Sequence, residues 1–136
     1  ISYDIKLIKT MEKKIIHTAN APQAIGPYSQ AVQVGNMLFL SGQIAINPQL
    51  GELEMPVITI ETHRVMKNII AVLEAADFNL TQVAKTTIFL SSMNHFQEVN
   101  TVYASYFKDT FPARETVAVA GLPKNVNVEI SMIAIK

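Results

Sequence analysis

The chain of 136 residues carries 11 basic and 11 acidic side chains, so its formal net charge is zero. This length predicts one domain with a buried core, and 49% hydrophobic against 16% charged residues excludes intrinsic disorder. The balanced charge argues against nucleic-acid binding, which needs an excess of Lys and Arg. The absence of cysteine excludes disulfides, thiol nucleophiles and thiolate metal sites, and it fits the reducing cytosol, so we expect a cytoplasmic protein.

The N-terminal residues 1–10 precede Met11, after which Glu12-Lys13-Lys14 resembles the ordinary start of a soluble protein. We interpret residues 1–10 as an appended or upstream extension, and residues 11–136 as the functional domain. No apolar run approaches the roughly 20 residues that a membrane-spanning helix needs. We therefore expect no membrane partner.

The first half of the domain is rich in turn signals and predicts short strands. Prolines and glycines make residues 20–30 a loop, and Gly35-Asn36 is a two-residue turn of the hairpin type. A second turn is indicated by Asn47-Pro48 and Gly51. Three strands are expected around these turns: Lys13–Thr18, Ala31–Val34 and Met37–Ser41.

The second half alternates helical and extended patterns. Apolar residues at helical spacing predict a helix over residues 57–76 and a second one from Met93 to Lys108. Strands are expected at Val83–Leu90, Thr116–Ala120 and Asn125–Ile135. The order β-β-β-α-β-α-β-β predicts a single α+β domain, with two helices packed on one face of a mixed sheet.

The last strand indicates self-association. Alternate residues from Val126 to Ala134 make one face apolar, and Ile133 and Ile135 make the other face apolar at one end. A sheet whose second face is also apolar needs a cover, and two helices on one side cannot supply it. We therefore expect a second subunit on that face.

Arg114 and Glu129 are the side chains with the strongest chemical signal. Arg114 enters an apolar strand, where its planar guanidinium suits a carboxylate or phosphate ligand, or a structural ion pair with Glu115 or Glu129. Glu129 interrupts an apolar strand, and it is either an outward-facing residue or a partly buried base. Arg64 lies off the apolar stripe of the first helix and is expected to be solvated.

Other candidates are weaker when each is taken alone. Asn100 is a polar residue on the apolar stripe of the second helix, where its amide bonds either to backbone or to a ligand. Tyr28 lies in the uncharged loop, and Ser41-Gly42 ends a strand. The histidines are far apart and no phosphate-cradling glycine loop is present, so we expect neither a metal nor a cofactor.

Five separated blocks of sequence carry a family signature when they are taken together. They are residues 21–31 (APQAIGPYSQA), 41–44 (SGQI), 111–120 (FPARETVAVA), 122–124 (LPK) and 128–130 (VEI). In this order they resemble the signatures of the RidA (YjgF-type) reactive-intermediate deaminase family. The resemblance covers residues 12–136 and leaves no further domain.

The resemblance implies a chorismate-mutase-like fold, a barrel-like homotrimer and sites in the clefts between subunits. Archetypal members hydrolyse 2-imino acids and their enamine tautomers, such as 2-iminobutanoate and 2-iminopropanoate, to 2-keto acids and ammonia. Arg114 matches the position that binds the substrate carboxylate, and Glu129 the position that orients water. Further matching positions are Tyr28 in catalysis and Ser41, Gly42, Asn100 and Thr116 in substrate binding.

Three positions depart from the family pattern. Thr116 stands where many members have Cys, which leaves a backbone contact possible. Ser131 replaces the second acid of a common Glu-x-Glu pair, so the charge near Glu129 falls. Glu115 replaces a small polar residue and would weaken the positive field around Arg114 if it faced inward.

Three other functions compete with imine hydrolysis. The same cleft could belong to a non-catalytic module that binds a keto acid or another amino-acid-derived ligand and regulates a partner. An RNA-directed activity is described for relatives, but residues 15–136 carry seven basic against nine acidic side chains, which argues against it. A chorismate mutase follows from fold analogy alone, which is weak support for function.

Overall fold

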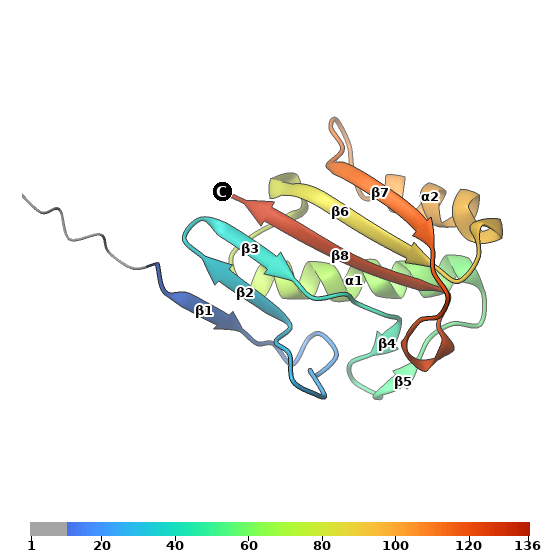
Figure 1. The fold of residues 1–136 in the computed structure, drawn as a ribbon, viewed down its shortest axis with the longest axis horizontal. Coiled ribbons are helices and arrows are strands. Elements are labelled where there is room, and N and C mark those ends of the chain that lie inside the picture. Colours follow the sequence, from blue (N-terminus) through green and yellow to red (C-terminus); the bar gives the residue numbers. More distant parts are fainter. Residues whose placement is uncertain (1–10) are drawn as a thin grey trace, which may run out of the picture.

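The computed structural model describes residues 11–136, so the expected extension at residues 1–10 lies outside the described residues. The chain forms one six-stranded sheet, a small two-stranded hairpin and two α-helices (Figure 1). The sheet strands are β1 (Lys13–Ile16), β2 (Ala31–Val34), β3 (Met37–Leu40), β6 (Val83–Leu90), β7 (Ala113–Ala118) and β8 (Val128–Ile135). The hairpin is β4 (Ile46–Asn47) with β5 (Glu52–Leu53), and the helices are α1 (Ile58–Ala75) and α2 (Phe96–Ala104).

The strand order in the sheet is β1-β2-β3-β8-β6-β7, and every pairing is antiparallel except that of β6 with β7. Parallel neighbours need a crossover connection, which α2 provides between β6 and β7. Helix α1 passes behind the sheet in the view of Figure 1, and α2 packs against α1. The predicted α+β domain with a mixed sheet and two helices is confirmed.

Several predicted boundaries are wrong. Strand β1 ends at Ile16 rather than Thr18, and β8 begins at Val128 rather than Asn125. The second helix is shorter than Met93–Lys108, because residues 93–95 form a 3-10 turn that Ser92 caps by accepting a hydrogen bond from the Asn94 N–H. Strand β7 begins at Ala113 rather than Thr116, since Ala113 already pairs with Lys85 of β6. The earlier start places Arg114 inside the strand.

The core lies between the sheet and the two helices. Alternate residues of β8 point into it, and all are buried: Val128, Ile130, Met132 and Ala134. They meet the apolar stripe of α1, whose buried members include Val65, Ile69 and Leu73. The predicted apolar stripe of α1 and the inward face of β8 are both confirmed.

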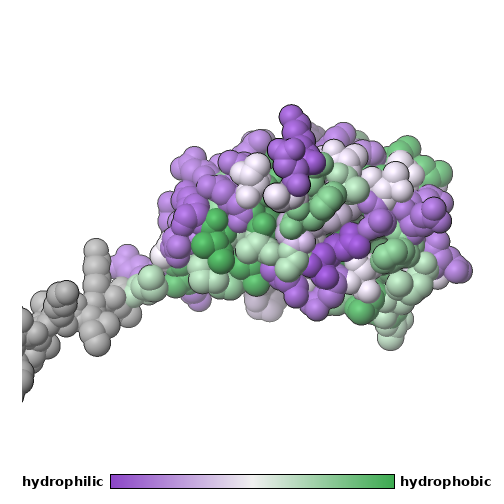
Figure 2. Space-filling model, turned by 90° about the horizontal axis from the view of Figure 1, so that it is seen from above, coloured by the Kyte–Doolittle hydropathy of each residue, from purple (hydrophilic) through white to green (hydrophobic). Residues whose placement is uncertain are grey.

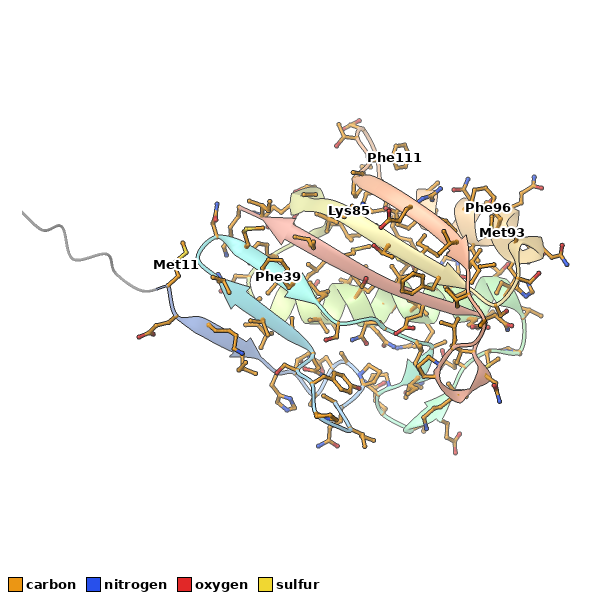
Figure 3. The ribbon with its side chains drawn as sticks, in the orientation of Figure 1. Met11, Phe39, Lys85, Met93, Phe96 and Phe111 are labelled. Atoms are coloured by element: carbon orange, nitrogen blue, oxygen red, sulfur yellow. The ribbon has the colours of Figure 1, made fainter. Side chains whose placement is uncertain are left out.

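The opposite face of the sheet has no covering helix within residues 11–136. Large apolar side chains on this open face are exposed, including Phe39 (39%), Val117 (46%) and Ile135 (40%). Phe39 is labelled on β3 in Figure 3, and hydrophobic patches also interrupt the polar surface seen from above in Figure 2. An apolar sheet face of this kind is typical of an interaction surface.

Helix α1 also holds the segment between β3 and β5 through polar contacts. The buried Asn68 donates to the carbonyls of Ile44 (3.0 Å) and Ile46 (2.9 Å). Arg64 Nε lies 3.0 Å from Glu54 Oε2, and its side chain is only 15% exposed. The expectation that Arg64 is solvated is therefore wrong, since it ties α1 to the residues after β5.

No helix within residues 11–136 is long and apolar enough to cross a membrane.

Candidate active site

Four of the predicted site residues line one cavity of about 470 Å³: Tyr28, Ser41, Gly42 and Glu129. Its remaining walls are largely apolar and include Pro22, Ile25, Ile44, Ile46 and Pro123. The cavity thus combines one carboxylate and several small polar groups with an apolar wall. Such a combination is typical of small-molecule sites.

The loop that carries Tyr28 is held by the buried side chain of Gln30. Its amide donates to the carbonyls of Thr18 (3.0 Å) and Pro22 (2.8 Å), and its oxygen accepts from the Thr18 N–H (2.7 Å). Ser41 closes the same loop, because its Oγ donates to the Ser29 carbonyl at 2.6 Å. The role of Gln30 was not predicted. The available signal in the sequence was a glutamine at the end of a loop that contains no charged residue.

Glu129 lies directly against Gly42. A Cβ atom placed on Gly42 would come 2.8 Å from Glu129 Cδ, so the glycine leaves the space that the carboxylate occupies. The approach is set by a bridge between neighbouring backbones, in which Gln43 N–H donates to the Ile130 carbonyl at 2.8 Å. Burial raises the pKa of Glu129 above its ordinary value of 4.5.

Arg114 lines a different cavity of about 430 Å³, together with Asn100 and Tyr103. Its Nη1 donates to Asn100 Oδ1 at 2.8 Å, and its Cζ lies 5.1 Å from the Tyr103 ring centre and 5.9 Å from that of Phe96. Phe96 lies on α2, as Figure 3 shows. The guanidinium is thus fixed by one amide and two aromatic rings, which leaves further N–H donors for an anion.

Tyr103 is itself fixed from behind. Its hydroxyl donates to Thr86 Oγ1 at 2.9 Å, and the whole side chain is buried. Burial is also the main reason why the pKa of Tyr103 is raised. The helical pattern of the sequence gives no sign of the contact between Tyr103 and Arg114, which depends on how the helix packs.

The structure answers part of the question left open for Arg114 and Asn100, namely their partners within residues 11–136. Within residues 11–136, Arg114 forms no salt bridge with Glu115 or Glu129, and Glu115 instead lies 3.4 Å from Lys85 Nζ. Glu115 is exposed and follows Arg114 in a strand, so it points to the other face and away from the guanidinium. Asn100 uses its amide oxygen for Arg114 rather than for backbone.

The two cavities lie on opposite faces of the sheet. Arg114 pairs across β6 with Thr86, which pairs with the buried Met132, so Arg114 belongs to the helix-covered face. Glu129 pairs with Phe89, which pairs with the exposed Val117, so Glu129 belongs to the open face. Within one chain, the structure therefore does not bring Arg114 and Glu129 together.

Thr116 lies two residues after Arg114 and hence on the same face. Its Oγ1 is buried and has no hydrogen-bond partner among the described residues. No group of three or more metal-ligating side chains occurs in residues 11–136. The site therefore consists of two separate groups: Tyr28, Ser41, Gly42 and Glu129 in one, and Asn100, Arg114 and Thr116 in the other.

Known proteins resemble the chain over nearly its full length. The profile of the family described as endoribonuclease L-PSP matches residues 18–136. A RutC family protein of Pyrococcus horikoshii is 50% identical over 124 residues, which cover 91% of this chain and 98% of the relative. Human 2-iminobutanoate/2-iminopropanoate deaminase is 43% identical over 129 residues, which cover 95% and 94%.

Solved structures agree with the sequence relatives. The Rid family protein YyfA of Yersinia pestis has a TM-score of 0.89 and 50% identity, covering 92% of this chain and all of that one. TdcF of E. coli, solved with bound serine, has a TM-score of 0.87 and 40% identity, covering 90% and 98%. The signature blocks, the fold and these matches agree, and the chain belongs to the endoribonuclease L-PSP family, that is, to the RidA (YjgF-type) proteins.

Proposed function

We propose that the protein hydrolyses reactive 2-imino acids and their enamine tautomers, such as 2-iminobutanoate and 2-iminopropanoate, to 2-keto acids and ammonia. The observation that carries the proposal is a half-buried carboxylate with a raised pKa, Glu129, in a cavity of substrate size. The name of the human relative supports this reaction, and the serine in TdcF supports a ligand of amino-acid size.

We propose further that the complete site is shared between subunits of a homotrimer. Arg114 and Glu129 lie on opposite faces of one sheet, so a single chain cannot present both to one small substrate. The exposed apolar side chains of the open face, such as Phe39 and Val117, supply a surface for association. Docking that surface against the Arg114 side of a neighbouring chain would join the two groups of residues.

In this site Arg114 binds the substrate carboxylate. Asn100 and the two aromatic rings hold the guanidinium in one orientation, so charge-assisted hydrogen bonds to the carboxylate form without reorganisation. The bound carboxylate places the C=N carbon beside Glu129 of the neighbouring chain. Positioning of this kind supplies a large part of catalysis.

Glu129 then acts on water. The ionised carboxylate takes a proton from a water molecule as its oxygen attacks the imine carbon, which gives a tetrahedral carbinolamine. When the imine nitrogen is protonated at the start, Glu129 returns the first proton to nitrogen and then accepts the hydroxyl proton of the carbinolamine as the C=O bond forms. The C–N bond breaks in the same step, and ammonia and the 2-keto acid leave. Tyr28 orients the water or the imine nitrogen, while Ser41, Gly42 and Thr116 contact the substrate. Proton transfer by one positioned group contributes about 10²–10⁴-fold.

The direct test couples the protein to a threonine dehydratase and follows the decay of the 2-aminocrotonate/2-iminobutanoate intermediate. We expect faster decay with the native chain, and decay at the blank rate with Arg114→Ala. Lys67→Ala is the matched control, because Lys67 is an exposed cation on α1. Native turnover by Arg114→Ala would contradict its role. A native chain no faster than the blank would favour the ligand-binding module, which calorimetric titration with 2-oxobutanoate would then test.

Mixing variants tests the shared site. Chains with Arg114→Ala and chains with Glu129→Gln should each keep only a small residual activity, whereas unfolding and refolding them together should restore turnover. Random assembly places an intact Arg114 opposite an intact Glu129 at about a quarter of the interfaces. A mixture that stays inactive, although it contains mixed oligomers by mass spectrometry, would contradict the shared site.

A further inference from the structure

A fully buried carboxylate outside both cavities connects helix α1 to the strand that carries Glu129. Glu61 is 0% exposed and accepts three hydrogen bonds, from the Asn127 N–H (2.7 Å), the Asn127 Nδ2 (2.9 Å) and the Val128 N–H (3.0 Å). Within residues 11–136 it forms no salt bridge. A buried carboxylate is costly unless it is fully hydrogen-bonded, so these donors hold the strand firmly.

The donors lie where the strand needs support. Asn127 and Val128 directly precede Glu129, and the segment before them includes Lys124 and Asn125, both with φ of 55°. Two successive non-glycine residues in the left-handed region are strained, and such a conformation persists only when neighbouring contacts fix it. The same segment supplies Pro123 and Lys124 to the wall of the Glu129 cavity.

Asn127 is also held from its other side. Ser91, at the end of β6, donates its N–H to the Asn127 carbonyl at 2.9 Å and its Oγ to Asn127 Oδ1 at 2.8 Å. The start of β8 is therefore fixed between α1 and β6. Removing the Glu61 carboxylate would leave two strand N–H groups without their acceptor and would release one of these two supports.

We infer that Glu61 is a positioning residue for Glu129, acting through Asn127, which directly precedes β8, and Val128, the first residue of that strand. The inference rests on the proposed function for its effect on turnover. Glu129 lies against Gly42 without room for one extra carbon, so a small displacement of the strand moves the carboxylate relative to the substrate. Arg114 is held by α2, and no hydrogen bond or ion pair within residues 11–136 joins it to this segment. A change at Glu61 should therefore leave binding of the substrate carboxylate unaffected.

The first test is Glu61→Gln, which keeps the size of the side chain but removes its charge and replaces one of its two acceptor oxygens with an NH₂ group, so at least one of the Asn127 and Val128 donors loses its acceptor. We expect kcat to fall about tenfold or more, since small misplacements of catalytic groups cost up to about 10²-fold, while KM stays within about twofold. Thr62→Val is the matched control. Thr62 is equally buried on the same helix, and its hydroxyl donates only to the Ile58 carbonyl, so kcat should stay native.

A double variant separates positioning from general destabilisation. If Glu61 acts through Glu129, Glu61→Gln should lower turnover by less than about twofold when Glu129→Gln is already present. Two effects that multiply in the double variant would overturn the inference. Should Glu61→Gln not fold, Asn127→Ala removes only the side-chain part of the link, and it should lower kcat in the same direction by a smaller factor; native kcat there would also overturn it.

A measurement without turnover keeps this inference distinguishable from the proposed function. NMR titration of ¹³C-labelled glutamate side chains reports on Glu129 directly. A displaced strand admits water to the carboxylate, so Glu61→Gln should lower the pKa of Glu129 towards its ordinary value. An unchanged Glu129 titration would overturn the positioning role even if the native chain hydrolyses imines. A shifted titration would support it even if another reaction takes place at this site.

Discussion

At the scale of single residues, Glu129 combines two opposed properties. A carboxylate inside a partly apolar cavity is destabilising when it is ionised, which is why burial raises its pKa. The same raised pKa brings it closer to the pH at which it exchanges protons with water and substrate. The residue that we propose as the catalytic base therefore lowers the stability of the fold when it is ionised.

The stability of the protein should report this cost. The pKa of Glu129 is higher in the folded state than in the unfolded state, so the folded state binds the proton more tightly. Protonated Glu129 therefore adds to the free energy of unfolding at low pH, and this contribution is lost as pH rises through the raised pKa. Glu129→Gln, which carries no charge, should therefore raise Tm at pH 7, and the gain should shrink at acidic pH. Calorimetry against Glu74→Gln, an exposed acid of α1, gives the comparison. A lower Tm at both pH values would contradict the burial cost.

The pH dependence of turnover should follow the same group. Glu129 must be ionised to accept a proton, so kcat/KM should fall on the acid side with an inflection above 4.5, the ordinary value for Glu. The measurement is a pH profile with a stable buffer series. An acid limb that persists unchanged in the residual activity of Glu129→Gln would assign the inflection to another group.

Gly42 gives a test based on space alone. Gly42 is not among the positive-φ glycines, so alanine is compatible with its backbone, but the added Cβ would meet the Glu129 carboxylate. We expect Gly42→Ala to lower kcat about 10–10²-fold through misplacement of this group. Gly121→Ala is the control, because a Cβ there meets nothing within 4 Å. Equal, native activity of both variants would show that the carboxylate can move away freely.

At the scale of elements, α2 holds the Arg114 guanidinium in one orientation without the help of any substrate. Three residues of this one helix, Phe96, Asn100 and Tyr103, contact the guanidinium. Their spacing of four and three residues places them on one helix face, and the start of β7 at Ala113 places Arg114 opposite that face. The helix thus acts as a rigid support for a flexible side chain.

The aromatic part of this support can be measured at Tyr103. Tyr103→Leu removes the ring under Arg114, and KM should rise about 2–30-fold, the equivalent of a cation–π contact of about 0.5–2 kcal/mol. Tyr103→Phe keeps the ring and loses only the bond to Thr86, so its KM should remain near the native value. Steady-state kinetics of both variants, measured well below their unfolding temperatures, gives the two KM values. Equal KM values for the two variants would show that the ring does not matter.

The elements differ in how far the sequence predicts them. A helical pattern predicted α1 nearly to the residue, and a period-two pattern predicted the apolar face and the end of β8, because hydrophobic burial dictates both. The start of β8 was expected at Asn125 and lies at Val128. The limits of α2 and β7 depended on a side-chain cap and on pairing with β6, which are tertiary effects. Arg64 was misassigned for the same reason. The turn before its partner Glu54 was predicted, but the contact of Glu54 with α1 is tertiary and no local pattern indicates it.

The candidate site shows the same division. The motif blocks hold six of the seven candidate residues, and Asn100 lies outside them. The structure brings Tyr28, Ser41, Gly42 and Glu129 to one cavity and places Arg114 and Asn100 at another, a division that the motifs did not indicate. The supporting residues Gln30 and Glu61 were not predicted, because their roles consist of hydrogen bonds to distant backbone. Such partners become visible only once the fold brings the segments together.

At the scale of the whole molecule, the open sheet face should control assembly. Phe39→Glu places a charge among its apolar side chains, and we expect the variant to become smaller in solution and to lose turnover with Arg114 and Glu129 unchanged. Ile60→Glu is the control, because Ile60 is similarly exposed (46%) but lies on α1. Light scattering gives the mass. An oligomer with native activity in Phe39→Glu would show that this face is not the interface.

The separation of Arg114 and Glu129 by the thickness of one sheet also links activity to abundance. A chain without a neighbour carries Arg114 and Glu129 on opposite faces and, in the shared site that we propose, cannot present both to one substrate. Dilution should therefore lower the rate per chain under conditions where the fold stays intact. Protein made at a low level would then remain catalytically inactive until its concentration exceeded the dissociation constant of the assembly. The amount of protein in the cell would act as a threshold, without any effector molecule.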